Sequence, residues 1–195
     1  RDEHINNYVQ SYLKDTSTDF LTALNNTPQM SPFSRNPLLL NVLCFVFIKQ
    51  RLILPTQRIE LYHQAVHEML KLRNPKIPES VKENALQEIA IYFLEGKEIF
   101  EEEYLRKILR DFLNKEGERY NEDDVLKELV EKSGLLCRFG DGLYIFLHLT
   151  FQEYMAACYI VEKIKDPSQF LEPVLFNPRF REVIRHTAGM LGSAE

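Results

Sequence analysis

The stretch LLCRFGDGLYIFLHLTFQEYMAA, residues Leu135 to Ala157, changes its hydrophobic period and so contains different elements in succession. Apolar side chains first alternate on either side of the Gly140-Asp141-Gly142 triplet, which predicts a β-hairpin with a three-residue turn. The sequence Thr150-Phe151-Gln152-Glu153 is then typical of a capping box, in which the Thr and Glu side chains satisfy two backbone N–H groups at a helix start. We therefore expect strands over 135–139 and 143–147, and a helix from about Phe151 to Ile164.

Helices are predicted immediately upstream of this hairpin. The first spans about residues 79–95 and ends at Gly96, and the second spans about residues 101–115. The third begins at the capping residue Asn121 and ends at Gly134. Three helices, a hairpin and a further helix form the layout of a winged helix, so the order of elements by itself indicates that module.

A separate helical subdomain is predicted nearer the N-terminus. Asn36 can cap a helix whose first position is Pro37, where the absent N–H is not needed. The apolar run that follows predicts a central, buried helix. The residues 74–78, Asn-Pro-Lys-Ile-Pro, then break helical structure. The fold class is thus mainly α, with a helical subdomain over residues 1–73, a winged helix over 74–165 and the start of a further helical layer over 166–195.

Composition and charge favour a protein or small-molecule partner. The formal charge of −5 provides no cationic surface for nucleic acid or an anionic membrane. The longest apolar run, Pro37 to Ile48, is shorter than the roughly 20 residues that cross a bilayer. The three cysteines lie in apolar runs without a CxxC pair, which indicates buried thiols in a reducing, cytoplasmic compartment. Because there is no initiator Met or signal peptide, we expect a piece of a longer chain.

His148 is the one candidate ligand contact that the residues themselves suggest. It lies just before the predicted helix start, where unpaired N–H groups and a partial positive charge favour an anion. An imidazole donor beside such a terminus could bind a phosphate oxygen. The alternative is a histidine that only ends a strand.

The segment FLHLTFQEYMAA, Phe146 to Ala157, resembles the winged-helix signature of NACHT proteins, the STAND-class signalling NTPases. In these proteins an aromatic residue, a histidine two positions on and then TFQEY or SFQEY enter the helix after the wing. The block Asn36-Pro37-Leu38-Leu39-Leu40, with Leu54-Pro55 and Ile59-Glu60-Leu61-Tyr62 after it, is similar to the first helical subdomain of the same family. The two blocks follow the family's order and together cover most of the chain.

The resemblance implies roles for two residues. In NACHT proteins the wing histidine contacts the terminal phosphate of ADP and holds a closed resting state, and the proline of the NPLL block packs near the adenine. By position these roles fall on His148 and Pro37. Bacterial proteins of similar pattern are often linked to defence or regulated cell death, so the resemblance implies a signalling switch in a protein that oligomerises when active.

The nucleotide machinery itself is expected elsewhere. None of the seven glycines begins a GxxxxGK[ST] loop, and no acidic box ends an apolar strand. We therefore predict no enzymatic activity, no catalytic residue and no cofactor for this chain alone. ADP or ATP with magnesium would bind a P-loop domain upstream in the same protein.

The residues also bear on two other functions and on a possible metal site. A DNA-binding winged helix would use the third helix as reader, but that helix has a charge near −3 and would repel phosphates. A helical protein-interaction domain without a nucleotide role is the remaining alternative. His63 and His67 share a helical face at metal-ligand spacing, but a third ligand is absent, so we expect no metal.

Overall fold

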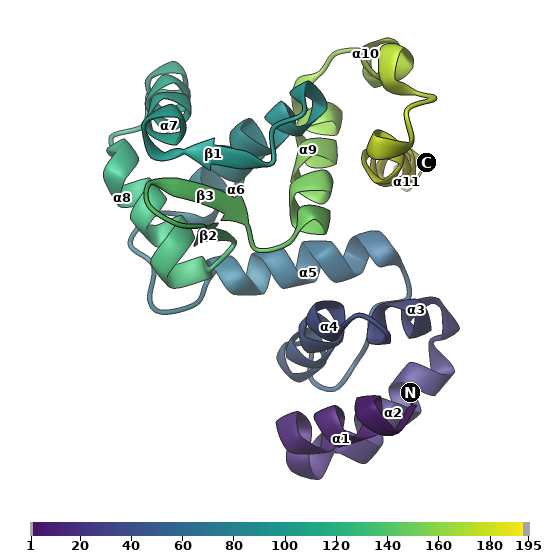
Figure 1. The fold of residues 1–195 in the computed structure, drawn as a ribbon. Helices are drawn as coiled ribbons and strands as arrows, with labels where there is room; N and C mark the ends of the chain where they lie inside the picture. The colour runs from purple at the N-terminus through teal and green to yellow at the C-terminus, as the bar shows by residue number, and fades with distance from the viewer. Residues whose placement is uncertain (1, 193–195) are drawn as a thin grey trace. The chain divides into compact units, whose positions relative to one another are not determined.

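The computed structural model describes residues 2–192 and divides them into two compact units, one ending at Glu68 and the other beginning at Met69 (Figure 1). Both units are mainly helical, and the second contains a small antiparallel sheet, so the predicted fold class is confirmed. The sequence placed its boundaries after residues 73 and 165, whereas the structure divides the chain inside a helix and keeps residues 166–192 with the second unit. Arg1 and residues 193–195 lie outside the described part.

The first unit is a set of helices around a buried aromatic core. Phe20 meets Phe47 edge to face, with ring centroids 5.2 Å apart, and both side chains are fully buried. The predicted central helix is confirmed, because Asn36 Oδ1 accepts hydrogen bonds from the N–H groups of Leu38 at 2.9 Å and Leu39 at 3.2 Å. The elements are α1 (Asp2–Leu13), η1 (Lys14–Thr16), α2 (Ser17–Asn26), η2 (Pro28–Met30), α3 (Ser31–Ser34), α4 (Pro37–Lys49) and α5 (Arg58–Leu70), whose last two residues belong to the second unit.

The second unit has the predicted winged-helix order. Asn121 Oδ1 accepts from the N–H of Asp124 at 2.8 Å and so caps the third helix as expected. Only its first half is α-helical; its second half is a π-helical segment that ends at Ser133, with Gly134 as the C-cap. The helices are α6 (Glu79–Ala90) with the 3₁₀ turn η3 (Ile91–Glu95), α7 (Glu102–Glu116), α8 (Glu122–Lys127) and the π-helical η4 (Glu128–Ser133).

The sheet has the strand order β1-β3-β2, all antiparallel. The predicted hairpin is confirmed as β2 (Leu136–Arg138) and β3 (Leu143–Phe146). The third strand, β1 (Ile99–Glu101), was not predicted, because Glu101 was expected to begin a helix. Phe100 lies opposite Tyr144 and is buried, so β1 adds an edge to the wing and packs it onto the core.

The wing leads directly into α9 (Leu149–Lys163), the central helix of the second unit (Figure 1). Its residues Phe151 to Cys158 are all buried. The C-terminal helices continue this packing, because α11 (Arg181–Gly192) lies against α9 and Phe180 meets Phe93 edge to face, with ring centroids 5.5 Å apart. They are α10 (Pro167–Leu171), η5 (Glu172–Val174), η6 (Pro178–Phe180) and α11 (Arg181–Gly192).

Candidate functional site

His148 joins β3 to α9 and is the N-cap of that helix. Its backbone is extended, and its carbonyl accepts from the N–H of Phe151 at 3.0 Å. Its Nδ1 accepts from the N–H of Thr150 at 3.3 Å. The helix therefore begins at Leu149, and the predicted capping box of Thr150 and Glu153 is wrong. The imidazole takes the acceptor role that the sequence analysis gave to the threonine hydroxyl.

These contacts set the tautomer of the His148 ring. A backbone N–H can only donate, so the Nδ1 that accepts from Thr150 carries no proton. The Thr150 hydroxyl lies 2.9 Å from the same nitrogen and can donate to it as well. Burial lowers the pKa of His148, which favours the neutral ring at neutral pH. The remaining nitrogen, Nε2, then carries the proton and is the hydrogen-bond donor of the ring.

The segment around His148 is tied down on both sides. The N–H of Leu147 donates to the carbonyl of Leu135 at 2.9 Å, which extends the hairpin to the residue before the histidine. In the first turn of α9, the buried Gln152 donates through Nε2 to the carbonyl of Lys97 at 2.8 Å. The ring is therefore presented at a fixed place, beside the N-terminus of a 15-residue helix whose partial positive charge favours anions.

Pro37 occupies the first position of α4, in the other unit. It is exposed and contributes to a cavity of about 230 Å³. The cavity is lined by His4, Ile5, Tyr8, Ser34, Arg35, Pro37 and Leu40. Tyr8 stacks on Tyr12 with ring centroids 5.9 Å apart, so flat apolar surfaces lie close to the proline. Pro37 belongs to the first unit and His148 to the second.

The remaining candidate groups are the His63–His67 pair and the three cysteines. The rings of His63 and His67 stack at 6.1 Å, and among residues 2–192 no group of three or more His, Cys, Asp or Glu side chains is placed to hold a metal ion. Burial raises the pKa of the Cys44 and Cys158 thiols to about 12, so both stay protonated. Cys137, expected to be buried, is partly exposed.

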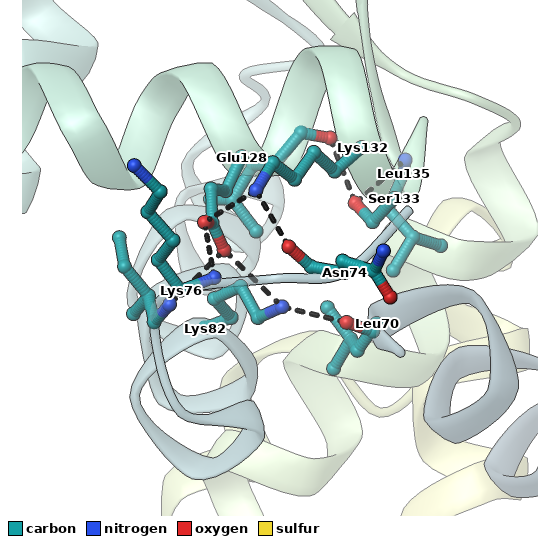
Figure 2. A network of polar contacts seen from close by, with 10 residues as sticks. Leu70, Asn74, Lys76, Lys82, Glu128, Lys132, Ser133 and Leu135 are labelled. Carbon is teal, nitrogen blue, oxygen red and sulfur yellow. Dashed lines mark hydrogen bonds and ion pairs between the residues drawn. The ribbon is translucent and has the colours of Figure 1, made fainter. Parts of the chain in front are cut away.

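The sequence analysis missed a buried cluster of charged side chains beneath η4. Glu128, one of the acidic residues that give the third helix its negative charge, is 5% exposed. It lies 3.5 Å from the ammonium of Lys82, which is fully buried, and 3.1 Å from that of Lys132 (Figure 2). The one local signal was the Glu128–Lys132 spacing of four residues, which suits an ion pair on a helix.

The comparisons with known proteins agree with this architecture. The family model described as "Winged helix-turn-helix domain C-terminal to NACHT" matches residues 55–160, which is more than half of the chain. The match extends from before α5 into α9 and includes His148. No curated protein matches the chain. In residues 2–192 no helix has both the length and the apolar character needed to span a membrane.

Proposed function

This chain belongs to the family of winged helix-turn-helix domains that lie C-terminal to NACHT, and on that premise we propose that it is the switch portion of a NACHT-type signalling protein. It closes over ADP or ATP held by the upstream NACHT domain of the same protein, with magnesium supplied at that domain. Closure keeps the protein inactive. Opening exposes a surface for self-oligomerisation, in cytoplasmic defence or stress signalling.

The observation that carries this proposal is the N-cap geometry of His148. Because Nδ1 already accepts from Thr150, the ring can meet a ligand only as an Nε2–H donor. A terminal phosphate oxygen is a strong acceptor, and the N-terminus of α9 favours its negative charge. His148 thus fits a phosphate contact without needing to be protonated.

The cavity at Pro37 supports a second contact with the nucleotide. The proline ring and the neighbouring Tyr8 offer apolar faces suited to a planar base. Pro37 is fixed at the start of α4 by the Asn36 cap, so its position does not depend on a flexible loop. We assign Pro37 to the adenine and His148 to the terminal phosphate.

The switch follows from a difference in contacts between two states. In the closed state His148 adds a hydrogen bond to ADP, and exchange for ATP removes that bond. A ligand can shift a conformational equilibrium only by binding one state better than the other. Loss of the His148 contact therefore lowers the preference for the closed state, and the winged helix swings open.

The test compares two substitutions in the full-length protein. His148→Ala removes both the cap and the Nε2–H donor, whereas His148→Asn keeps a side chain that can cap a helix but is too short to replace Nε2. A hydrogen bond to a charged group contributes enough that both variants should release ADP about tenfold faster or more. They should also signal without stimulus.

Release of labelled ADP from the purified variants provides the measurement. Native-like release from His148→Asn, with fast release only from His148→Ala, would mean that the histidine acts as a cap alone. Unchanged release from both variants would remove the switch role.

A protein-interaction domain without a nucleotide role is the second candidate. It is favoured by two exposed apolar side chains in the turn between η5 and η6, where Phe176 is 93% exposed and Leu175 is 49% exposed. Exposed patches of this kind mark interaction sites. In that case nucleotide release would not respond to any substitution at His148 or Pro37.

A further inference from the structure

The linker, residues 71–78 between α5 and α6, has an unusual backbone. Arg73 and Asn74 have positive φ values of 57° and 51°. This region is sterically unfavourable for every residue that has a Cβ atom, although less so for asparagine than for most. Two such residues in succession persist only when contacts from other parts of the chain hold them.

The carboxylate of Glu128 provides the main contacts to this linker. Its Oε1 accepts from the N–H of Lys76 at 2.6 Å, and its Oε2 accepts from the N–H of Ile77 at 3.3 Å (Figure 2). Burial alone would raise the pKa of Glu128, but these two N–H groups, Lys132 and the charge of Lys82 outweigh it and lower the net pKa. The carboxylate therefore stays charged at neutral pH, and charged acceptors make the stronger hydrogen bonds.

Lys82 extends the same contacts to the end of α5. Its ammonium lies 3.5 Å from Glu128 and donates to the carbonyl of Leu70 at 2.6 Å. Leu70 is the last residue of α5, where carbonyl groups have no partner within the helix. A fully buried lysine therefore joins the C-terminus of α5 to α6 and η4.

Two further cationic side chains connect the linker to η4 through hydrogen bonds to backbone carbonyl groups. Lys132 donates to Glu128 at 3.1 Å and to the carbonyl of Asn74 at 2.9 Å. The guanidinium of Arg73 donates to the carbonyl of Glu131. We refer to Glu128, Lys82 and Lys132 as the Glu128 cluster. It contacts the carbonyl of Leu70 just before the linker, and within the linker the carbonyl of Asn74 and the N–H groups of Lys76 and Ile77.

The Glu128 cluster is also connected to the wing. Ser133, at the end of η4, donates to the carbonyl of Leu129 at 2.8 Å and accepts from the N–H of Leu135 at 3.3 Å. The carbonyl of Leu135 in turn accepts from the N–H of Leu147, next to His148. One run of hydrogen-bonded segments thus leads from the linker to the candidate phosphate contact.

We propose that the Glu128 cluster is a second latch of the resting state, which holds the linker in its turned conformation and must release it when the winged helix opens. This inference rests on the proposed function, since it requires a closed and an open state. The linker is the only covalent path from α5 to α6, so a rotation of the winged helix against α5 must be absorbed by its φ and ψ angles. Glu128 is a positioning residue in this role and does not touch the nucleotide.

Hydrogen exchange in the full-length protein tests the latch directly. Pro75 and Pro78 have no amide, so Lys76 and Ile77 provide the only backbone N–H groups of residues 75–78. With ADP bound, these two amides should exchange slowly. With a non-hydrolysable ATP analogue bound, they should exchange at least about tenfold faster, because opening exposes them. Equal rates in the two states would overturn the proposal.

Three substitutions separate the latch from general stability. Glu128→Gln should speed exchange of both amides about tenfold in the ADP state, because an amide has one acceptor oxygen and no charge. Glu131→Gln changes the same charge at an exposed position of η4 and should leave the rate unchanged. If Glu128→Gln does not fold, Lys132→Gln decides, with an expected increase of about fivefold. Native rates in the variant that decides would overturn the latch.

The two proposals fail in different measurements. Fast ADP release from His148→Asn, together with amide exchange rates in the linker that are the same with ADP and with the ATP analogue, would overturn the latch. The proposed phosphate contact would then still be supported. Linker amides that respond to the nucleotide, with unchanged ADP release from the His148 variants, would support the latch and remove the phosphate contact.

Discussion

His148 shows how one side chain can both stabilise a helix and bind a ligand. One ring nitrogen satisfies the first turn of α9, and the other remains a donor. A serine or threonine at the same position would cap the helix equally well but would not reach beyond it. The imidazole is therefore suited to a site where one side chain must cap a helix N-terminus and also donate a hydrogen bond to a ligand.

The lowered pKa of His148 leads to a prediction about pH. The unfolded chain takes up a proton on this residue near its ordinary pKa of about 6.5, whereas the folded chain resists protonation because of burial and because Nδ1 is already an acceptor. The free energy of unfolding should thus fall as the pH drops below about 6.5, and level off below the folded-state pKa.

Urea unfolding of the native chain and of His148→Asn between pH 8 and pH 5 measures this effect. Other groups titrate in both proteins and cancel in the difference. The native chain should lose more stability than the variant over this range. Parallel curves for the two proteins would show that His148 does not resist protonation in the fold.

Side-chain hydrogen bonds could be predicted from the sequence where donor and acceptor lie within a few residues of each other. Asn36 and Asn121 are preferred N-caps, and both cap the expected helices. His148 was missed as a cap because histidine is not among the preferred residues and Thr150 with Glu153 fitted a familiar box. Glu128 was missed because its backbone partners, Lys76 and Ile77, lie about 50 positions earlier in the chain.

At the scale of elements, α4 offers a clean test of capping. Asn36→Ala removes the acceptor for two N–H groups and should cost about 1 kcal/mol of the free energy of unfolding. Asn41→Ala makes the same change at an exposed interior position of α4, where alanine is the better helix former. That control should be neutral or slightly stabilising.

Denaturant unfolding followed by circular dichroism provides both values. Equal stabilities of the two variants would contradict the role of Asn36. Because Pro37 follows the cap directly, a fall in ADP affinity in Asn36→Ala of the full-length protein would further connect the start of α4 to the nucleotide.

Two kinds of element could not be predicted from the sequence. One kind is too short to show a hydrophobic period, and the other depends on contacts with residues far away in the chain. β1 has only three residues, so one buried side chain, Phe100, gives no period to detect. The π-helical η4 continues the apolar pattern of α8, and its altered pitch comes with the side-chain contacts of Glu128 and Lys132. The hairpin and α9 were predictable because each has a strong local pattern of its own.

On the scale of the whole molecule, charge is distributed so that cations meet acids within the chain. Lys82 and Lys132 meet Glu128 in the interior, and Arg179 meets Glu98 at 2.6 Å near the C-terminal helices. The net charge of −5 means that acidic side chains outnumber basic ones over the whole chain. The net charge could be predicted from the sequence, whereas the ion pairs that form are visible only in the structure.

That distribution predicts how the chain behaves toward DNA. In a DNA-binding winged helix the third helix would enter the major groove, but here α8 begins with Glu122, Asp123 and Asp124. Two cations of α7, Arg106 and Arg110, are paired with Asp123 and Glu122. We expect no saturable binding of duplex DNA in a fluorescence-anisotropy titration, even at low salt, where phosphate contacts are strongest. Replacing all three acids by lysine should release Arg110 from Glu122 while Arg106 keeps its pair with Glu102. The added positive charge should create weak binding that declines steeply with salt, which provides the positive control. Tight, saturable binding by the native chain would instead make the winged helix a DNA reader, and the acidic start of α8 would then have to face away from the groove.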